Sequence, residues 1–160
     1  MKKESTADEA HEKTFFIGLT EKNGKIPVTA STLKEIAQTA FEVTGMGPGE
    51  ISLVVCDDAF ITGLNREYRR KNNSTDVLSF SMGGNGEDDE IIPVLGDIVI
   101  SIQTAAVQAR DQGTSVEEEF TFLFIHGLLH LLGFTHDHAD DEKVMMDMTS
   151  EILSGIEGNT

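Results

Sequence analysis

The stretch that decides the fold runs from residue 126 to residue 136 and reads His-Gly-Leu-Leu-His-Leu-Leu-Gly-Phe-Thr-His. His126 and His130 are four residues apart, so a helix places both rings on one face, about 6 Å apart along its axis. Gly133 follows, and glycine readily takes the positive φ that ends a helix and turns the chain back. His136 then follows the turn, where it can meet the other two imidazoles. Three histidines converging from one side leave one tetrahedral position of a zinc ion open, as in catalytic zinc sites.

The spacing of this run matches the H-E-x-x-H-x-x-G-x-x-H pattern of metzincin proteases except at Gly127, where the pattern has Glu. In zincins that Glu is the general base. The sequence therefore favours a metal site and disfavours peptide hydrolysis of the zincin kind. The alternative is that both are core histidines hydrogen-bonded to the backbone. This accounts for two histidines four residues apart, but it leaves the third histidine and the glycine unexplained. His138 is either a fourth ligand or, as we favour, a solvated residue at the start of the last helix, and His11 lies in a polar tail.

The helix that carries the first two histidines has clear boundaries in the sequence. Ser115 and Glu118 form a capping box, and the acidic residues 117–119 suit the positive end of the helix dipole. Residues 120–132 are almost all apolar, which is typical of a buried helix, and the run is too short to span a membrane. Burial disfavours the charged form of histidine, and neutral imidazole is the form that binds metal.

The composition predicts one domain in 160 residues, with 39% hydrophobic residues for its core. We expect a disordered acidic tail over residues 1–13, a catalytic domain over residues 14–154 and a flexible C-terminus over residues 155–160. The single cysteine, Cys56, excludes an internal disulfide and is expected to be a small buried hydrophobe. The start of the chain has no apolar stretch typical of a signal peptide, so we expect a cytoplasmic protein.

Strands and helices are expected to alternate in an α+β domain, a small mixed β-sheet covered by helices, with the metal site on a buried central helix and the following turn. Strands are predicted at residues 14–19, 50–56, 76–82 and 97–101. Helices are predicted from a Thr32–Glu35 capping box to Gly45, from Asp57 or Asp58 into a basic cluster, from Ser101 to Gln112, and from about Asp140 to Leu153. The methionines of the last helix are interpreted as packing residues rather than as a metzincin Met-turn, because they lie in a helical context.

The formal net charge of −16 argues against non-specific binding of nucleic acid. Four of the basic residues nevertheless lie within six positions: Arg66, Arg69, Arg70 and Lys71. One interpretation is a helix C-terminus whose cations suit the dipole. The other is a local phosphate site, which global acidity weakens but does not forbid.

Three segments together resemble the YbeY family of bacterial endoribonucleases. The first is the histidine run, the second combines Leu64-Asn65, Tyr68-Arg69 and residues 75–80, and the third is Leu95-Gly96-Asp97 with the four residues after it. Order and spacing agree from about residue 50 to 138. The chain departs from the family pattern at Thr135, where Asp is usual, and at Ser74 and Ser81, where prolines are common.

The resemblance implies a zinc-dependent, single-strand-specific endoribonuclease that matures the 3′ end of small-subunit ribosomal RNA and takes part in ribosome quality control. It implies one zinc ion held by His126, His130 and His136, and a functional arginine at Arg69. A guanidinium there can donate two hydrogen bonds to a phosphate or stabilise charge in the transition state. The alternative is a structural ion pair with Asp76 or Asp97, and Asp76 is either an orienting carboxylate or a strand cap.

The basic neighbours Arg66, Arg70 and Lys71 are predicted to hold the flanking RNA backbone. Zinc is a Lewis acid for a phosphoryl oxygen and lowers the pKa of a bound water toward ~7. Attack by hydroxide or by the RNA's own 2′-hydroxyl both remain open. Two rival functions are a zinc hydrolase of another class, such as a peptidase or amidase, and a non-enzymatic ribosome-assembly factor with a structural metal.

Overall fold

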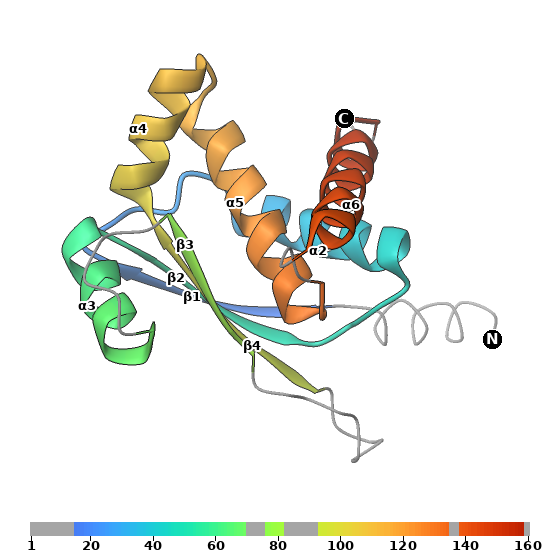
Figure 1. The fold of residues 1–160 in the computed structure, drawn as a ribbon, viewed down its shortest axis with the longest axis horizontal. Helices are drawn as coiled ribbons and strands as arrows, with labels where there is room; N and C mark the ends of the chain where they lie inside the picture. The colour runs from blue at the N-terminus through green and yellow to red at the C-terminus, as the bar shows by residue number, and fades with distance from the viewer. Residues whose placement is uncertain (1–14, 70–75, 82–92, 135–137, 159–160) are drawn as a thin grey trace.

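The computed structural model describes residues 15–69, 76–81, 93–134 and 138–158 (Figure 1). Its strands are β1 (Phe16–Lys22), β2 (Glu50–Cys56), β3 (Val77–Ser81) and β4 (Val94–Ser101). They form one mixed sheet in the order β1-β2-β4-β3, in which β1, β2 and β4 are parallel and β3 is antiparallel to β4. The central strands β2 and β4 are nearly continuous apolar runs because both of their faces are covered.

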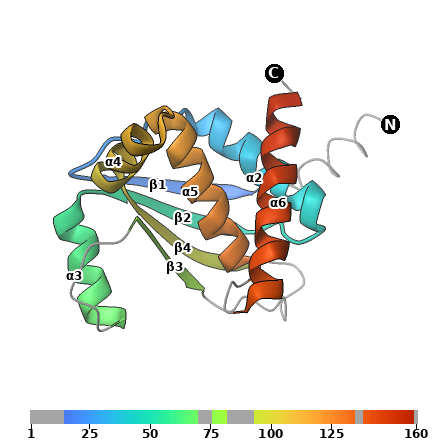
Figure 2. The same ribbon diagram turned by 45° about the horizontal axis from the view of Figure 1, so that its top comes forward.

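Five helices are described: α2 (Ala30–Thr44), α3 (Asp58–Arg69), α4 (Ile102–Gln112), α5 (Val116–Leu131) and α6 (Ala139–Gly158). Helices α2 and α5 cover one face of the sheet, and α6 packs across both of them (Figures 1 and 2). Helix α3 lies against the other face, and α4 packs beside α5 at the end of β4. The predicted α+β domain with a mixed sheet covered by helices is confirmed.

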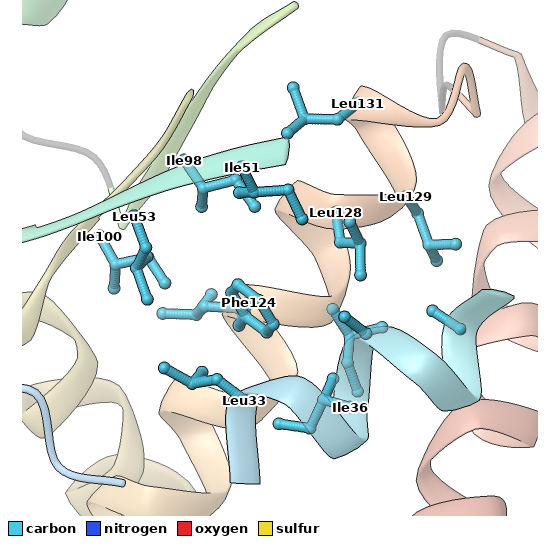
Figure 3. Close-up of a cluster of buried hydrophobic side chains, with 14 of the residues drawn as sticks. Leu33, Ile36, Ile51, Leu53, Ile98, Ile100, Phe124, Leu128, Leu129 and Leu131 are labelled. Carbon is cyan, nitrogen blue, oxygen red and sulfur yellow. The ribbon is translucent and has the colours of Figure 1, made fainter. Parts of the chain in front are cut away.

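The main core lies between α5 and the sheet. Figure 3 shows Leu53, Ile98 and Ile100 of the strands facing Phe124 and Leu128 of α5, and all five side chains are fully buried. Burying a side chain of this size contributes about 1.5–3 kcal/mol, so this contact fixes the position of α5 on the sheet. The predicted buried central helix is therefore observed.

A smaller core lies under α3, on the opposite face of the sheet. Cys56, Leu78 and Val99 from the strands pack there against Ile61 of α3. Cys56 is fully buried, and burial raises the pKa of its thiol to about 12, with the nearby Asp57 and Asp58 acting in the same direction. The cysteine is an unreactive core residue, as its position in an apolar strand predicts.

Most of the predicted helix boundaries are confirmed. Ser115 and Glu118 form the reciprocal capping box of α5, and Ser101 caps α4, which ends at Gly113 in the left-handed conformation. The capping box predicted at Thr32 is wrong. Helix α2 begins one turn earlier, because Thr29 adopts extended backbone and its hydroxyl accepts the Thr32 N–H bond at 3.1 Å.

Two strand ends differ from the prediction by three residues each. Strand β1 extends to Lys22 because its parallel pairing with β2 continues to Cys56. Strand β4 starts at Val94, three residues before the predicted Asp97, where its pairing with β2 begins.

The flexible C-terminus predicted for residues 155–160 is helical through Gly158. The sequence predicts the end of this helix at about Leu153, but Gly155 lies where α6 crosses α2, and a Cβ there would stand 2.8 Å from Thr39 Cγ2. The predicted tail over residues 1–13 lies outside the described residues. Among the described helices, none is long and apolar enough to cross a membrane.

Candidate active site

Helix α5 brings the first two predicted ligands together. The rings of His126 and His130 have centroids 4.9 Å apart at an angle of 69°, and both side chains are half-buried. Two imidazoles bound to one tetrahedral zinc at about 2.1 Å have ring centres roughly 5 Å apart. The observed spacing and the imidazole donors are therefore compatible with two ligands of one zinc ion.

Gly127 lies where α5 comes closest to the sheet. A Cβ there would stand 2.8 Å from Ile98 Cγ2 and 3.2 Å from Ser79 Oγ, and the Ser79 hydroxyl donates a hydrogen bond of 3.2 Å to the Gly127 carbonyl. Ile98 is a fully buried, β-branched residue, so it cannot move aside at low cost. The position that is Glu in zincins thus faces the sheet in this chain, and there is no room for a side chain there. Gly127 is a packing requirement, and a general base must come from elsewhere.

The C-terminus of α5 has the turn that the sequence predicts. Gly133 has a φ of 105°, its N–H bonds the His130 carbonyl, and the Phe134 N–H bonds the Leu129 carbonyl. These two bonds form a Schellman motif, which satisfies carbonyls that the helix leaves free. Phe134 packs against the main core, so the exit direction of the chain is fixed one turn after His130.

The third predicted ligand, His136, lies outside the described residues, as does Thr135. Among the residues that the structure does describe, no group of three or more His, Cys, Asp or Glu is placed to hold a metal. His138 is exposed at the start of α6, where its carbonyl accepts the Glu142 N–H bond at 2.9 Å.

Helix α3, which leads into the predicted basic cluster, lies on the other side of the sheet from the histidine helix. Helix α3 ends at Arg69, whose side chain is not described, and Arg66 is exposed one turn earlier. Arg70 and Lys71 lie outside the described residues. Tyr68 of α3 packs edge-to-face on Phe80 of β3 with ring centroids 5.6 Å apart, whereas the neighbouring Ser79 contacts α5. The edge strand β3 therefore separates the end of α3 from the histidine helix (Figure 2).

Asp76 is held at the entry to β3. Its carboxylate accepts the Val77 N–H bond at 2.8 Å and the Gln108 amide at 3.2 Å, and its carbonyl accepts the Ser101 N–H bond at 3.0 Å. These bonds join β3, β4 and α4, which is the strand-capping role that was one of its two predicted roles.

The sequence interpretation missed Glu119, which was assigned only to the helix dipole. Glu119 is buried in the first turn of α5, and its pKa is raised, first by desolvation and then by the charge of Asp76. A spacing of seven residues places it two turns before His126 on a similar face of the helix, and that spacing was the available sequence signal.

Comparisons with known proteins agree with the predicted resemblance. The family model described as "Endoribonuclease YbeY" matches residues 19–157, a longer stretch than the motifs alone covered. The Endoribonuclease YbeY of Pelotomaculum thermopropionicum is 42% identical over 138 residues, which is 81% of this chain and 90% of the relative. That of Aquifex aeolicus is 40% identical over 131 residues, covering 81% of this chain and 85% of the relative.

A solved structure shares the fold. The solution structure of a Thermotoga maritima protein superposes with a TM-score of 0.61 at 23% sequence identity, covering 90% of this chain and 91% of that one. At this identity the likeness supports the fold, and the family follows from the sequence matches above. The chain belongs to the YbeY family of endoribonucleases.

Proposed function

We propose that this protein is a zinc-dependent endoribonuclease that cuts single-stranded RNA, with zinc bound by His126, His130 and His136. The observation that carries the proposal is the pair of imidazoles 4.9 Å apart on a helix that ends in a tight glycine turn, in a chain of the YbeY family. Zinc, when bound, supplies Lewis acidity toward a phosphoryl oxygen and lowers the pKa of water.

The chain's own residues hold the substrate and stabilise charge. We assign Arg69 to the reacting phosphate, because a guanidinium matches two phosphate oxygens at once. Arg66, Arg70 and Lys71 hold the neighbouring phosphates. Since the end of α3 and the histidines lie on opposite sides of β3, the RNA crosses the edge of the sheet at β3 to reach both. An extended single strand can follow such a bent path, whereas a stiff double helix cannot, so strand specificity follows from this arrangement.

Ribosomal RNA is the proposed substrate, with maturation of the 3′ end of the small-subunit RNA and ribosome quality control as the processes. We propose the small ribosomal subunit as partner and the cytoplasm as location. The proposal is supported by the resemblance at the motif residues. It is also supported by relatives named as endoribonucleases, which this chain matches over most of their length.

Cleavage assays test this function directly. The zinc-loaded protein and the chelated protein are each incubated with single-stranded RNA, double-stranded RNA and casein. We expect cleavage of single-stranded RNA by the zinc-loaded protein alone, its loss in His130→Ala and its retention in His138→Ala. Cleavage of casein without RNA cleavage would favour the peptidase alternative. A folded His130→Ala protein that still supports ribosome maturation would favour a non-enzymatic assembly factor.

The product ends separate the two routes of attack. Water as the nucleophile leaves linear phosphate ends, whereas the 2′-hydroxyl as nucleophile leaves a 2′,3′-cyclic phosphate. Position 127 has no room for a carboxylate side chain that could activate a water molecule. This position therefore gives no reason to prefer water over the 2′-hydroxyl as the nucleophile. Mass spectrometry of the 3′ ends decides between the two.

A further inference from the structure

A pocket of about 360 Å³ lies between α5 and α6, directly beside the histidine pair. Phe122 and His126 of α5 form one wall, and Met145, Met146 and Leu153 of α6 form the other. Its volume is within the range of about 300–1,000 Å³ in which proteins bury small ligands. Because His126 is part of the wall, the pocket adjoins the candidate active site.

The ring of Phe122 offers a flat stacking surface in this pocket. It is 42% exposed, and its centroid is 6.2 Å from that of His126 with the two rings tilted by 31°. Unstacked bases of single-stranded RNA commonly stack on such exposed aromatic rings, and thioether sulfurs also contact aromatic rings favourably. The combination of Phe122 with two methionines therefore suits a planar aromatic ligand.

The charge of the pocket selects a base over a phosphate. No Lys or Arg lines it among the described residues, whereas Glu142 does, and Asp140 and Asp141 lie in the same first turn of α6. Within α6, all of whose backbone the structure describes, the single lysine is Lys143, and it pairs with Asp147 at 3.1 Å. An ionised carboxylate repels phosphate and only accepts hydrogen bonds, so its ligand must present N–H donors. Guanine is the base that presents an imino N–H and an amino group side by side on one edge, which matches the two oxygens of a carboxylate.

We propose that this pocket binds a guanine base of the RNA substrate, adjacent to the phosphodiester that is cut. Phe122 stacks on the base, and the Glu142 carboxylate accepts from its imino and amino groups. This inference rests on the proposed ribonuclease function, and it makes the enzyme a guanine-selective nuclease within single-stranded RNA.

Cleavage of designed oligonucleotides tests the selectivity. The substrates are uridine 12-mers with one central guanosine, adenosine or cytidine, and the measured quantity is kcat/KM at each bond. We expect the guanosine 12-mer to be cut fastest, at a fixed distance from the guanosine. Phe122→Ala should lower kcat/KM on it about 5- to 150-fold, which is the loss of one base–aromatic stack. Glu142→Gln should bring the ratio of guanosine to adenosine cleavage close to one.

Matched variants control for general effects. Phe16→Ala removes an equally exposed phenylalanine, 41%, on β1, and Glu151→Gln removes an exposed carboxylate from α6 outside the pocket. Both should keep the native rates and the native guanosine preference. Equal rates on all three 12-mers by the native protein, with no loss in Phe122→Ala, would overturn the proposal. If Phe122→Ala is unstable, Phe122→Leu keeps the apolar volume and removes only the aromatic face.

A binding measurement separates this proposal from the nuclease function. The zinc-loaded protein with ¹³C-labelled methionine methyls is titrated with 2′-O-methylated six-mers that carry each of the four bases. The methyls of Met145 and Met146 should shift at the lowest concentration with the guanine six-mer, and that of the exposed Met46, which does not line the pocket, should not. If the guanine six-mer shifts these methyls but the protein cuts no RNA, the nuclease function is refuted and the guanine pocket is not. Met145 and Met146 methyls that no six-mer moves would refute the guanine pocket and leave its apolar walls to a protein partner.

Discussion

Single residues determine which chemistry α5 can support, and Gly127 is the clearest case. Its sequence position suggested a missing general base, and the structure gives a steric reason for the missing side chain. Three different atoms of β3 and β4 close off the space that a Cβ would need. The metzincin-like histidine spacing therefore occurs here in a helix whose face at position 127 packs directly against the sheet.

We expect Gly127→Ala to lower the free energy of unfolding by about 1–3 kcal/mol, because the new methyl overpacks against Ile98. The matched control is Gly63→Ala in α3, where nothing lies within 4 Å of the new Cβ. That change should stabilise the protein by up to about 1 kcal/mol through helix propensity. Denaturant unfolding of both variants checks this, and a stabilised Gly127→Ala protein would contradict the close packing.

Glu119 predicts a pH dependence of stability. Its pKa is raised in the folded state, so the folded protein binds this proton more tightly than the unfolded chain. The stabilising contribution is complete below the unfolded pKa of about 4.3 and is lost as pH rises through the higher folded pKa. Glu119→Gln should therefore raise the melting temperature at pH 7 and change it less at pH 4.

The exposed Glu117, in the same first turn, is the control for Glu119. Glu117→Gln should lower the stability at pH 7 by about 0.3–1 kcal/mol, since it removes a favourable charge from the helix N-terminus. The two substitutions are thus expected to have opposite signs. Equal losses of stability in both variants would mean that Glu119 is an ordinary dipole-stabilising acid.

At the scale of elements, α5 shows what the sequence can predict. Its capping box, its buried apolar face and its glycine end were all predictable, because each depends on residues close together in the chain. The C-terminal extent of α6 was not predictable, because Gly155 lies where α6 crosses α2, and no local sequence pattern reveals that contact. The position of α3 across the sheet from α5 was also unpredictable, because it depends on which faces of β2, β3 and β4 are covered.

The turn after α5 is expected to control metal binding. Gly133 has a φ of 105°, a conformation that costs an L-residue about 1–2 kcal/mol. Gly133→Ala should therefore lower the stability by about that amount and weaken zinc binding, because the chain leading to His136 leaves the helix at this residue. Gly63→Ala again serves as the control, and a zinc affinity unchanged from the native protein would show that the third ligand does not depend on this turn.

For the whole molecule, the strongest constraint on the mechanism is that β3 lies between the end of α3 and the histidine helix α5. The net charge is −16, and α5 and α6 begin with acidic turns, so the proposed function assigns phosphate binding to the end of α3. In the proposed function, substrate binding and metal binding are therefore distinct tasks of opposite faces of one small sheet. The motif analysis predicts residues for both sites, and only the fold shows that an edge strand lies between the end of α3 and α5.

We expect Arg69→Ala to lower kcat/KM on single-stranded RNA about 100-fold or more, the loss typical of removing one donor to a developing anion. The zinc content should stay unchanged, because α3 lies across the sheet from the histidines. Arg110→Ala is the control, since Arg110 is an exposed arginine at the end of α4 whose ion partner is Asp111 at 3.8 Å. If Arg69→Ala cleaves RNA as fast as Arg110→Ala, Arg69 has a structural role only.

Zinc content per chain tests the central claim most directly, by elemental analysis of the purified native protein beside His136→Ala and His138→Ala. The account predicts one zinc ion in the native chain and in His138→Ala, and far less than one in a folded His136→Ala protein. A native chain that takes up no zinc, or a His136→Ala protein that retains it fully, would contradict the three-histidine site.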